Sequence, residues 1–183
     1  PEIEDACNMQ AWGMTVRYKG TEYRSFKMGI DSAAMHMFKL KVTNGNHNFL
    51  TENSEEIAIT EQLARQLFGT ENPLGQEIEI YGQKKRICAV IQSWSRHSNI
   101  PYEIVDNFSP GDNRTQWYAS MCQTFIKLKK GVDAQKFIQK LYEHTYETEN
   151  SIVVKKSVAT PITAMRYDRP NQGVTVKYEH IRL

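Results

Sequence analysis

Residues 55–104 carry the pattern that most restricts what this chain can fold into. Ile57 and Ile59 alternate with smaller or polar neighbours, as in a short half-buried strand, and Thr60 follows with a hydroxyl suited to capping a helix. Gly69 is suited to ending that helix, because glycine adopts the left-handed C-terminal conformation without steric cost. The apolar residues between them lie at helical spacing on one face: Leu63, Ala64, Leu67 and Phe68. The pattern predicts a strand followed at once by a helix that is held by burial.

A turn and a hairpin follow this helix. Asn72-Pro73-Leu74-Gly75 is typical of a turn, because proline presets φ at its second position and glycine is permissive at its fourth. Residues 76–81 alternate between apolar and polar side chains, and Gly82-Gln83 leads into residues 85–91, whose sequence ICAVI is typical of a strand buried on both faces. The whole stretch therefore predicts strand, helix and hairpin in that order.

The same stretch carries a resemblance to a known family. The run ITEQLARQLFGTENPLGQEI, a strand ending in AVI and then SNIPYEI resemble the MacB-like periplasmic core domain of bacterial ABC-transporter permeases. The resemblance extends more loosely from PEIE at the start to the segment near Lys177-Tyr178, and it is weakest across 161–173. Among the branches of this family, the chain is most similar to the short extracytoplasmic domains of Bacteroidetes permeases.

The rest of the N-terminal part predicts further elements of mixed structure. Proline, acidic residues and the apolar spacing of Ile3, Ala6 and Cys7 predict a first helix over residues 1–10. Residues 14–18 and 22–30 predict a hairpin. Asp31 is suited to capping a short helix that runs to Phe38. Residues 38–42 predict another strand, and 44–46 a loop.

In the C-terminal part, the resemblance and the local pattern lead to the predicted architecture. Residues 106–116 predict an exposed connection, 122–129 a strand and 151–159 a further strand, with a helical apolar stripe at Ala134, Phe137, Ile138, Leu141 and Tyr142. Strand, helix, strand is one half of a split βαβ arrangement. We therefore expect an α+β fold. The resemblance implies two lobes: a porter-like α/β sandwich of about 1–54 and 106–183, and an inserted lobe of strands and a short helix over about 55–105.

Charge and cysteine content exclude some classes of function. The 23 basic and 21 acidic residues give a net charge of +2, which argues against a nucleic-acid partner. The local basic clusters, Lys84-Lys85-Arg86, Lys127–Lys130 and Lys155-Lys156, are interpreted as solvated strand ends and turns. Cys7, Cys88 and Cys122 stand alone, without the paired spacing of a zinc or redox motif. A disulfide between two of the three stays open, and Cys88 is interpreted as a small buried hydrophobe.

A search for catalytic, cofactor and metal residues leads us to expect none. The histidines have no metal-binding spacing: His36, His47, His97, His144 and His180. Ser93, Ser95, His97 and Ser98 lack the elbow motif of a hydrolase and are interpreted as a polar strand-to-loop transition. The acidic pairs Glu55-Glu56 and Glu77/Glu79 are interpreted as solvent-facing positions. No glycine-rich loop that binds phosphate is present. We therefore predict that the chain is not an enzyme.

The resemblance implies a transport function. It implies a non-catalytic periplasmic domain of an ABC-transporter permease that couples cytoplasmic ATP hydrolysis to export, extrusion or release of a substrate. The implied partners are a cytoplasmic ATP-binding subunit or domain, a second permease copy in a homodimer or heterodimer, and a periplasmic adaptor or outer-membrane factor. The chain has no apolar run long enough to span a bilayer. It is interpreted as a fragment of an inner-membrane protein whose membrane helices flank it, one before residue 1 and three after residue 183.

Two alternatives from other classes stay open. The first is an extracytoplasmic ligand-binding sensory domain with a pocket for a sugar or a peptide, lined by aromatic residues: Trp12, Trp94, Trp117, Tyr102 and Tyr118. The second is a secreted enzyme, for which loss of turnover in a Ser95→Ala variant would be the evidence. The ordinary interpretation of these aromatic residues is packing between the lobes.

Overall fold

The computed structural model describes residues 1–93, 102–108, 122–148 and 161–162. Before residue 132, the described residues form eight strands, two α-helices and a short 3-10 helix. A third α-helix follows after residue 132. In chain order the elements are β1 (Ile3–Tyr18), β2 (Thr21–Ile30), α1 (Ser32–Met37), β3 (Val42–Gly45), η1 (Asn48–Leu50), β4 (Glu56–Thr60), α2 (Glu61–Phe68), β5 (Glu77–Ile80), β6 (Gln83–Ile91), β7 (Ile104–Asn107), β8 (Gln123–Leu128) and α3 (Ala134–Thr148). The fold is α+β, as predicted.

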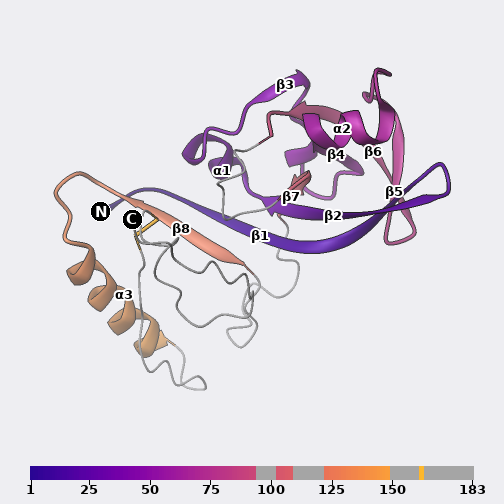
Figure 1. Ribbon diagram of the computed structural model, residues 1–183. Coiled ribbons are helices and arrows are strands. Elements are labelled where there is room, and N and C mark those ends of the chain that lie inside the picture. The colour runs from indigo at the N-terminus through magenta and orange to yellow at the C-terminus, as the bar shows by residue number, and fades with distance from the viewer. Residues whose placement is uncertain (94–101, 109–121, 149–160, 163–183) are drawn as a thin grey trace, which may run out of the picture. The chain divides into compact units, whose positions relative to one another are not determined.

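The chain divides into two compact units, Pro1–Val132 and Asp133–Leu183. The first contains all the described strands, and α3 lies in the second (Figure 1). The predicted division into a lobe of 1–54 with 106–183 and an inserted lobe of 55–105 stays a prediction. The predicted strand over 151–159 lies outside the described residues. None of the described helices has the length and apolar character that crossing a membrane requires.

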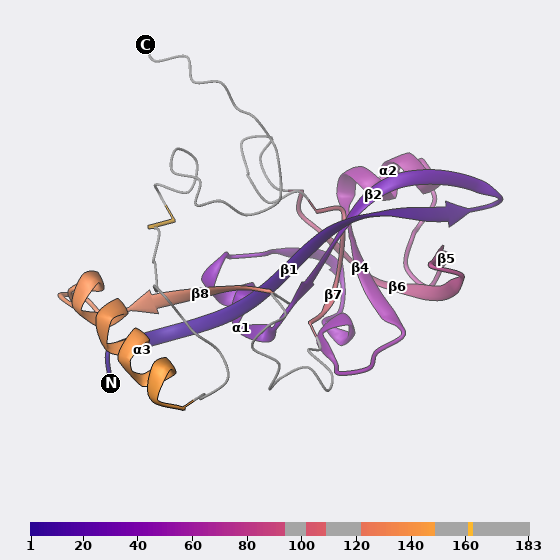
Figure 2. The same ribbon diagram turned by 90° about the horizontal axis from the view of Figure 1, so that it is seen from below.

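Six strands of the first unit form a closed ring of pairings. β1 pairs with β2, β2 with β7, β7 with β4, β4 with β6, β6 with β5, and β5 again with β1. The β2–β7 and β4–β6 pairs are parallel, and the others are antiparallel. β3 pairs with β6 outside the ring. β8 pairs with the N-terminal half of β1 (Figure 2). The β5–β1 contact that closes the ring consists of two residue pairs, Val16 with Ile80 and Arg17 with Glu79.

Two apolar clusters hold this sheet together. The ring core receives buried side chains from β1, β4, β5, β6 and β7 and from the apolar face of α2. The outer core lies between the sheet and the segment that contains α1 and η1, and Phe49 and Met28 are fully buried in it. β1 contributes to both, because Cys7 and Met9 lie on one face and Met14, Val16 and Tyr18 on the other. This strand therefore joins the two cores.

The predictions for residues 55–91 are confirmed in detail. β4 leads directly into α2, the side chain of Thr60 accepts a hydrogen bond from the backbone N–H of Leu63 at 3.2 Å, and Gly69 ends the helix with a φ of 62°. The turn before β5 is fixed by the side chain of Asn72, which accepts from the backbone N–H of Leu74 at 3.1 Å. The β5–β6 hairpin follows as predicted.

Two predictions for the N-terminal part are wrong. Residues 1–10 do not form a helix, because residues 3–10 belong to β1, whose pairing with β8 runs from Ile3 to Met9. The burial of Cys7 and Met9 has the period of a strand. Tertiary pairing outweighs the local helical signals here. The strand predicted over 38–42 is β3, which begins at Val42 and includes part of the predicted loop. The helix capped by Asp31 is confirmed, and the carboxylate of Asp31 accepts from the backbone N–H groups of Ala34 and Asn8.

The Thr60 cap gives a direct test of the central element. We expect Thr60→Val to lower the free energy of unfolding by about 1 to 2 kcal/mol, because it removes the only oxygen of that side chain and leaves the N–H of Leu63 buried without its partner. Urea unfolding followed by circular dichroism measures the change. Thr60→Ser keeps the hydroxyl and is the control. A loss in Thr60→Ser with none in Thr60→Val would show that the methyl group, and not the cap, matters at this position.

Candidate functional site

The candidates for chemistry that the structure describes do not gather in one place. His36 lies in the last turn of α1, His47 stacks on Phe49 with ring centroids 6.1 Å apart, and His144 lies in α3. His97 and His180 lie outside the described residues. Within the described part of the chain, no three histidine, cysteine or acidic side chains come together as a group suited to a metal ion.

The serines and acids of the hydrolase hypothesis have structural contacts or lie outside the described residues. The hydroxyl of Ser93 accepts from the backbone N–H of Gln62 at 3.3 Å. Ser95, His97 and Ser98 are not described. Glu55 pairs with Lys85 at 3.4 Å, and Glu77 pairs with Lys84 at 3.5 Å. These contacts join strands and strand ends, and they explain the carboxylates without an acid–base function.

The basic clusters are also divided among separate contacts. Lys127 pairs with Glu4 at 2.5 Å, and the side chain of Lys129 donates to the backbone carbonyl of Pro1 at 2.7 Å. Lys155-Lys156 lies outside the described residues. Charges distributed in this way suit individual ion pairs rather than a continuous basic surface.

The three cysteines are free thiols. Burial and the nearby carboxylate of Asp31 raise the pKa of Cys7 to about 11, and burial raises the pKa of Cys88. The half-buried thiol of Cys122 lies 3.6 Å from the side-chain oxygen of Asn8. Thiolate is the reactive form, so Cys7 and Cys88 are protected both by burial and by protonation.

This difference predicts the outcome of thiol labelling. With Ellman's reagent at neutral pH, we expect Cys122 to react in the folded chain and Cys7 and Cys88 to react only after unfolding in guanidinium. Mass spectrometry of the labelled peptides identifies the site. Rapid reaction of Cys88 in the folded chain would contradict its place in the outer core.

The described surface is hollowed beside the β1–β2 hairpin. A hollow of about 390 Å³ lies where β1 separates from the turn between β5 and β6, beyond the pairing of Val16 with Ile80. Its lining residues come from these strands: Gly13, Met14, Thr15, Arg17, Glu22, Glu79, Tyr81 and Gly82. The lining residues from Gly13 to Glu22 are brought together by the β1–β2 hairpin, and those from Glu79 to Gly82 by the β5–β6 hairpin. The two hairpins meet through the closure of the ring.

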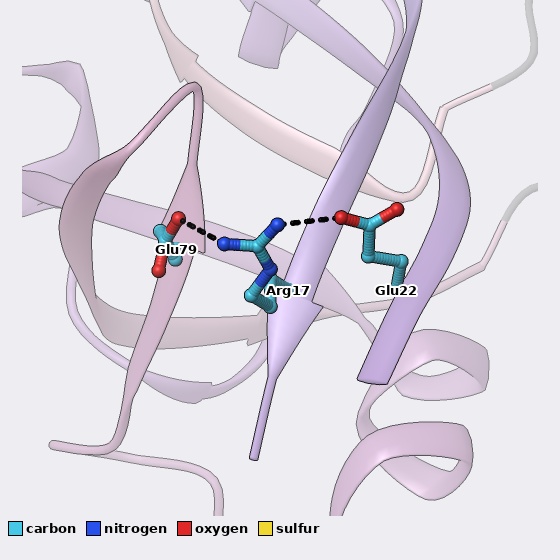
Figure 3. A network of polar contacts seen from close by, with 3 residues as sticks. All are labelled: Arg17, Glu22 and Glu79. Atoms are coloured by element: carbon cyan, nitrogen blue, oxygen red, sulfur yellow. Dashed lines mark hydrogen bonds and ion pairs between the residues drawn. The ribbon is translucent and has the colours of Figure 1, made fainter. Parts of the chain in front are cut away.

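An ion network spans one side of this hollow. The guanidinium of Arg17 donates to Glu22 at 2.6 Å and to Glu79 at 3.2 Å, so that it lies between the two carboxylates (Figure 3). Arg17 and Glu22 face each other across the hairpin, and Arg17 and Glu79 face each other across the β1–β5 pair. The hydrogen bond to Glu22, followed by the charge of Glu79, raises the pKa of Arg17. The network fixes the orientation of three charged groups on three strands.

A second set of contacts continues from the rim of the hollow. The indole N–H of Trp12 donates to the phenol oxygen of Tyr81 at 3.1 Å, and the ammonium of Lys27 lies over the Trp12 ring, 5.1 Å from its centroid. Lys27 also forms an ion pair with Asp106, and both side chains are 16% exposed. Burial raises the pKa of Asp106, although the charges of Lys27 and Lys85 act in the opposite direction. Oδ1 of Asp106 is buried and has no hydrogen-bond partner among the described residues.

Of the two described aromatic residues that were proposed to line a pocket, Trp12 lies beside the hollow. Tyr102 is buried in the outer core, and Trp94, Trp117 and Tyr118 lie outside the described residues. Sequence reasoning did not select Arg17, Glu22 or Tyr81. The hairpin register places Arg17 opposite Glu22, so that pair was open to prediction. The contacts with Glu79 and Tyr81 depend on ring closure, for which the sequence carries no local signal.

Comparisons with known proteins agree with this fold. A family model described as MacB-like periplasmic core domain matches residues 1–143. Comparison with curated proteins gives no match. A domain of a candidate permease protein from Porphyromonas gingivalis is similar with a TM-score of 0.71 and 17% identity, over 82% of this chain and 66% of that chain. The chain thus spans just under two thirds of that structure.

Two further solved structures share the fold. The periplasmic region of MacB from Actinobacillus actinomycetemcomitans has a TM-score of 0.62 and 14% identity, over 80% of this chain and 67% of that chain. The extracellular domain of the noncanonic ABC-type transporter YknZ from Gram-positive bacteria has a TM-score of 0.59 and 19% identity, over 81% of this chain and 79% of that chain. At these identities the likeness is one of fold.

Proposed function

The chain belongs to the family of MacB-like periplasmic core domains, which are periplasmic domains of ABC-transporter permeases, and from this premise we propose that it transmits motion without catalysing a reaction. In this proposal, ATP binding and hydrolysis by a cytoplasmic partner move the membrane segments of the permease, and the domain converts that motion into export, extrusion or release of a substrate. The match of the family model over residues 1–143 is the observation that carries the proposal. A second permease copy and a periplasmic adaptor or outer-membrane factor are the further partners proposed.

The long first strand supports a mechanical function. The 16 residues of β1 extend over about 50 Å at the usual rise per residue. β1 pairs with β2 without interruption from Met9 to Tyr18. A displacement applied at the start of β1 would therefore reach the hairpin through a continuous ladder of backbone hydrogen bonds, rather than through a loop.

The N-terminal end of β1 is also tied to β8. The backbone N–H of Lys129 donates to the carbonyl of Glu2 at 3.0 Å, in addition to the contact of its side chain with Pro1. A force on Pro1 would act on two neighbouring strands at once. The ring of paired strands beyond them favours movement as a rigid body. Leu183, through which a second connection to the membrane is expected, lies outside the described residues.

A linker insertion in the full-length permease, reconstituted with its ATPase in nanodiscs, tests this proposal. The displacement of a spin label at Lys19 between nucleotide-free and ATP-bound states is measured by electron paramagnetic resonance. A flexible Gly-Ser linker inserted before Pro1 is expected to abolish the displacement while ATP hydrolysis continues, because the linker absorbs the motion. The same linker inserted after Ser54, between η1 and β4 and outside β1, is the control. An unchanged displacement with the linker before Pro1 would contradict transmission through β1.

A further inference from the structure

The hollow beside the β1–β2 hairpin offers an open floor. Gly13 on β1 and Gly82 in the β5–β6 turn contribute no side chain, and a Cβ added at Gly82 would meet no atom within 4 Å. The volume of about 390 Å³ falls within the range of small-molecule sites. Backbone and side-chain groups on both sides of the hollow are therefore accessible to a ligand of modest size.

Tyr81 stands at the rim of the hollow, in the two-residue turn between β5 and β6. Its side chain is 67% exposed, and its φ of 50° is unfavourable for an aromatic residue. Gly82, the other residue of this turn, has a φ of 76°, so the two-residue hairpin turn itself sets the backbone of Tyr81 and directs its side chain outward. The hydrogen bond from Trp12, whose own ring lies against Lys27, fixes the phenol end of Tyr81. The result is an exposed aromatic face held in a defined position.

The Arg17 network supplies fixed donors and acceptors next to this ring. Glu22 and Glu79 each use Oε1 to accept from Arg17, and within the described part of the chain their Oε2 atoms accept no hydrogen bond. The two carboxylates and the guanidinium together carry a net charge of only −1. A cationic ligand would have to compete with Arg17 for the carboxylates, whereas an apolar ligand would desolvate all three charged groups.

We infer that this hollow binds a saccharide, with one sugar ring stacked on Tyr81 and its hydroxyls bonded to Arg17, Glu22 and Glu79. A sugar hydroxyl both donates and accepts, which matches neighbouring carboxylate and guanidinium groups, and the C–H face of a pyranose suits an exposed aromatic ring. The inference goes beyond the proposed transmission of motion and does not depend on it. It gives the domain a ligand of the polyhydroxylated class.

Nuclear magnetic resonance titration of the 183-residue chain tests the inference. The probes are maltose, cellobiose and N,N′-diacetylchitobiose, added up to their solubility limits, with arginine amide as a cationic comparison. The indole N–H signal of Trp12, assigned through Trp12→Phe, reports on the hollow because this group donates to Tyr81. We expect a saturable shift of that signal with at least one of the sugars.

Matched variants connect the binding to the hollow. Tyr81→Asn removes the ring but favours the positive φ of the turn, so the variant keeps its fold and is expected to bind at least about fivefold more weakly. Glu79→Gln is expected to weaken binding similarly, and Glu77→Gln, on the same strand outside the hollow, to leave it unchanged. The inference is overturned if no sugar gives a saturable shift, if Tyr81→Asn binds as well as the parent, or if arginine amide alone moves the Trp12 signal.

Discussion

Gly45→Ala is expected to destabilise the chain by about 3 to 5 kcal/mol, through a clash with backbone added to backbone strain. A Cβ at position 45 would lie 2.1 Å from the carbonyl oxygen of Cys88 and 2.8 Å from the Cα of Ala89, and the φ of Gly45 is +95°. Neither neighbour can move by a side-chain rotation, because both atoms belong to the backbone of β6. The substitution therefore forces β3 away from the ring. Urea unfolding of the purified chain measures the loss.

Gly20→Ala separates the clash from the strain. Gly20 has a comparable φ of +81°, but a Cβ there would meet nothing within 4 Å. Its expected cost is about 1 kcal/mol, the penalty of a left-handed conformation alone. If Gly20→Ala and Gly45→Ala lower the free energy of unfolding equally, then β3 does not lie against Cys88 and Ala89 as the structure places it.

The accuracy of the sequence predictions depended on how local the determining contacts are. Some elements depend on residues within a few positions of one another, so a short stretch of sequence is enough to predict them. They are the cap at Thr60, the end of α2 at Gly69 and the turn at Asn72. The first ten residues carry equally local helical signals. Their conformation is instead decided by β8, more than a hundred residues away, and the local interpretation was wrong.

The same limit applies to the ring and to the hollow. The parallel pairing of β2 with β7 and the return of β5 to β1 join segments that no short-range pattern connects. Composition and periodicity predicted an α+β fold, and the resemblance predicted the family, but neither indicated that six strands close on themselves. Glu79 appeared in the sequence as a solvent-facing acid, and only the closure places it 3.2 Å from Arg17.

The ion pair of Lys27 and Asp106 is expected to be asymmetric, so that losing the lysine costs far more than losing the acid. Desolvation already outweighs the attraction of Lys27 in setting the pKa of Asp106, which means that the fold tolerates a neutral group at position 106. Asp106→Asn leaves Lys27 without its carboxylate but still over the Trp12 ring, and it should therefore cost less than Lys27→Met at neutral pH. Lys27→Met leaves a buried carboxylate without its partner, and it should cost about 3 kcal/mol.

The pH dependence of these variants gives the sharper test. A carboxyl group whose pKa is raised in the fold binds protons more tightly in the folded than in the unfolded chain, so its contribution to stability increases as the pH falls between the unfolded and folded pKa values. Without Lys27 the folded pKa of Asp106 rises further, so the loss in Lys27→Met should shrink as the pH is lowered and Asp106 becomes neutral.

The double variant Lys27→Met/Asp106→Asn, which carries no buried charge at either position, should recover most of the loss at neutral pH. Urea unfolding at a series of pH values measures all three. A Lys27→Met variant whose deficit is the same at every pH, or is not reduced by Asp106→Asn, would mean that Lys27 stabilises the fold through its packing against Trp12 rather than through the charge of Asp106.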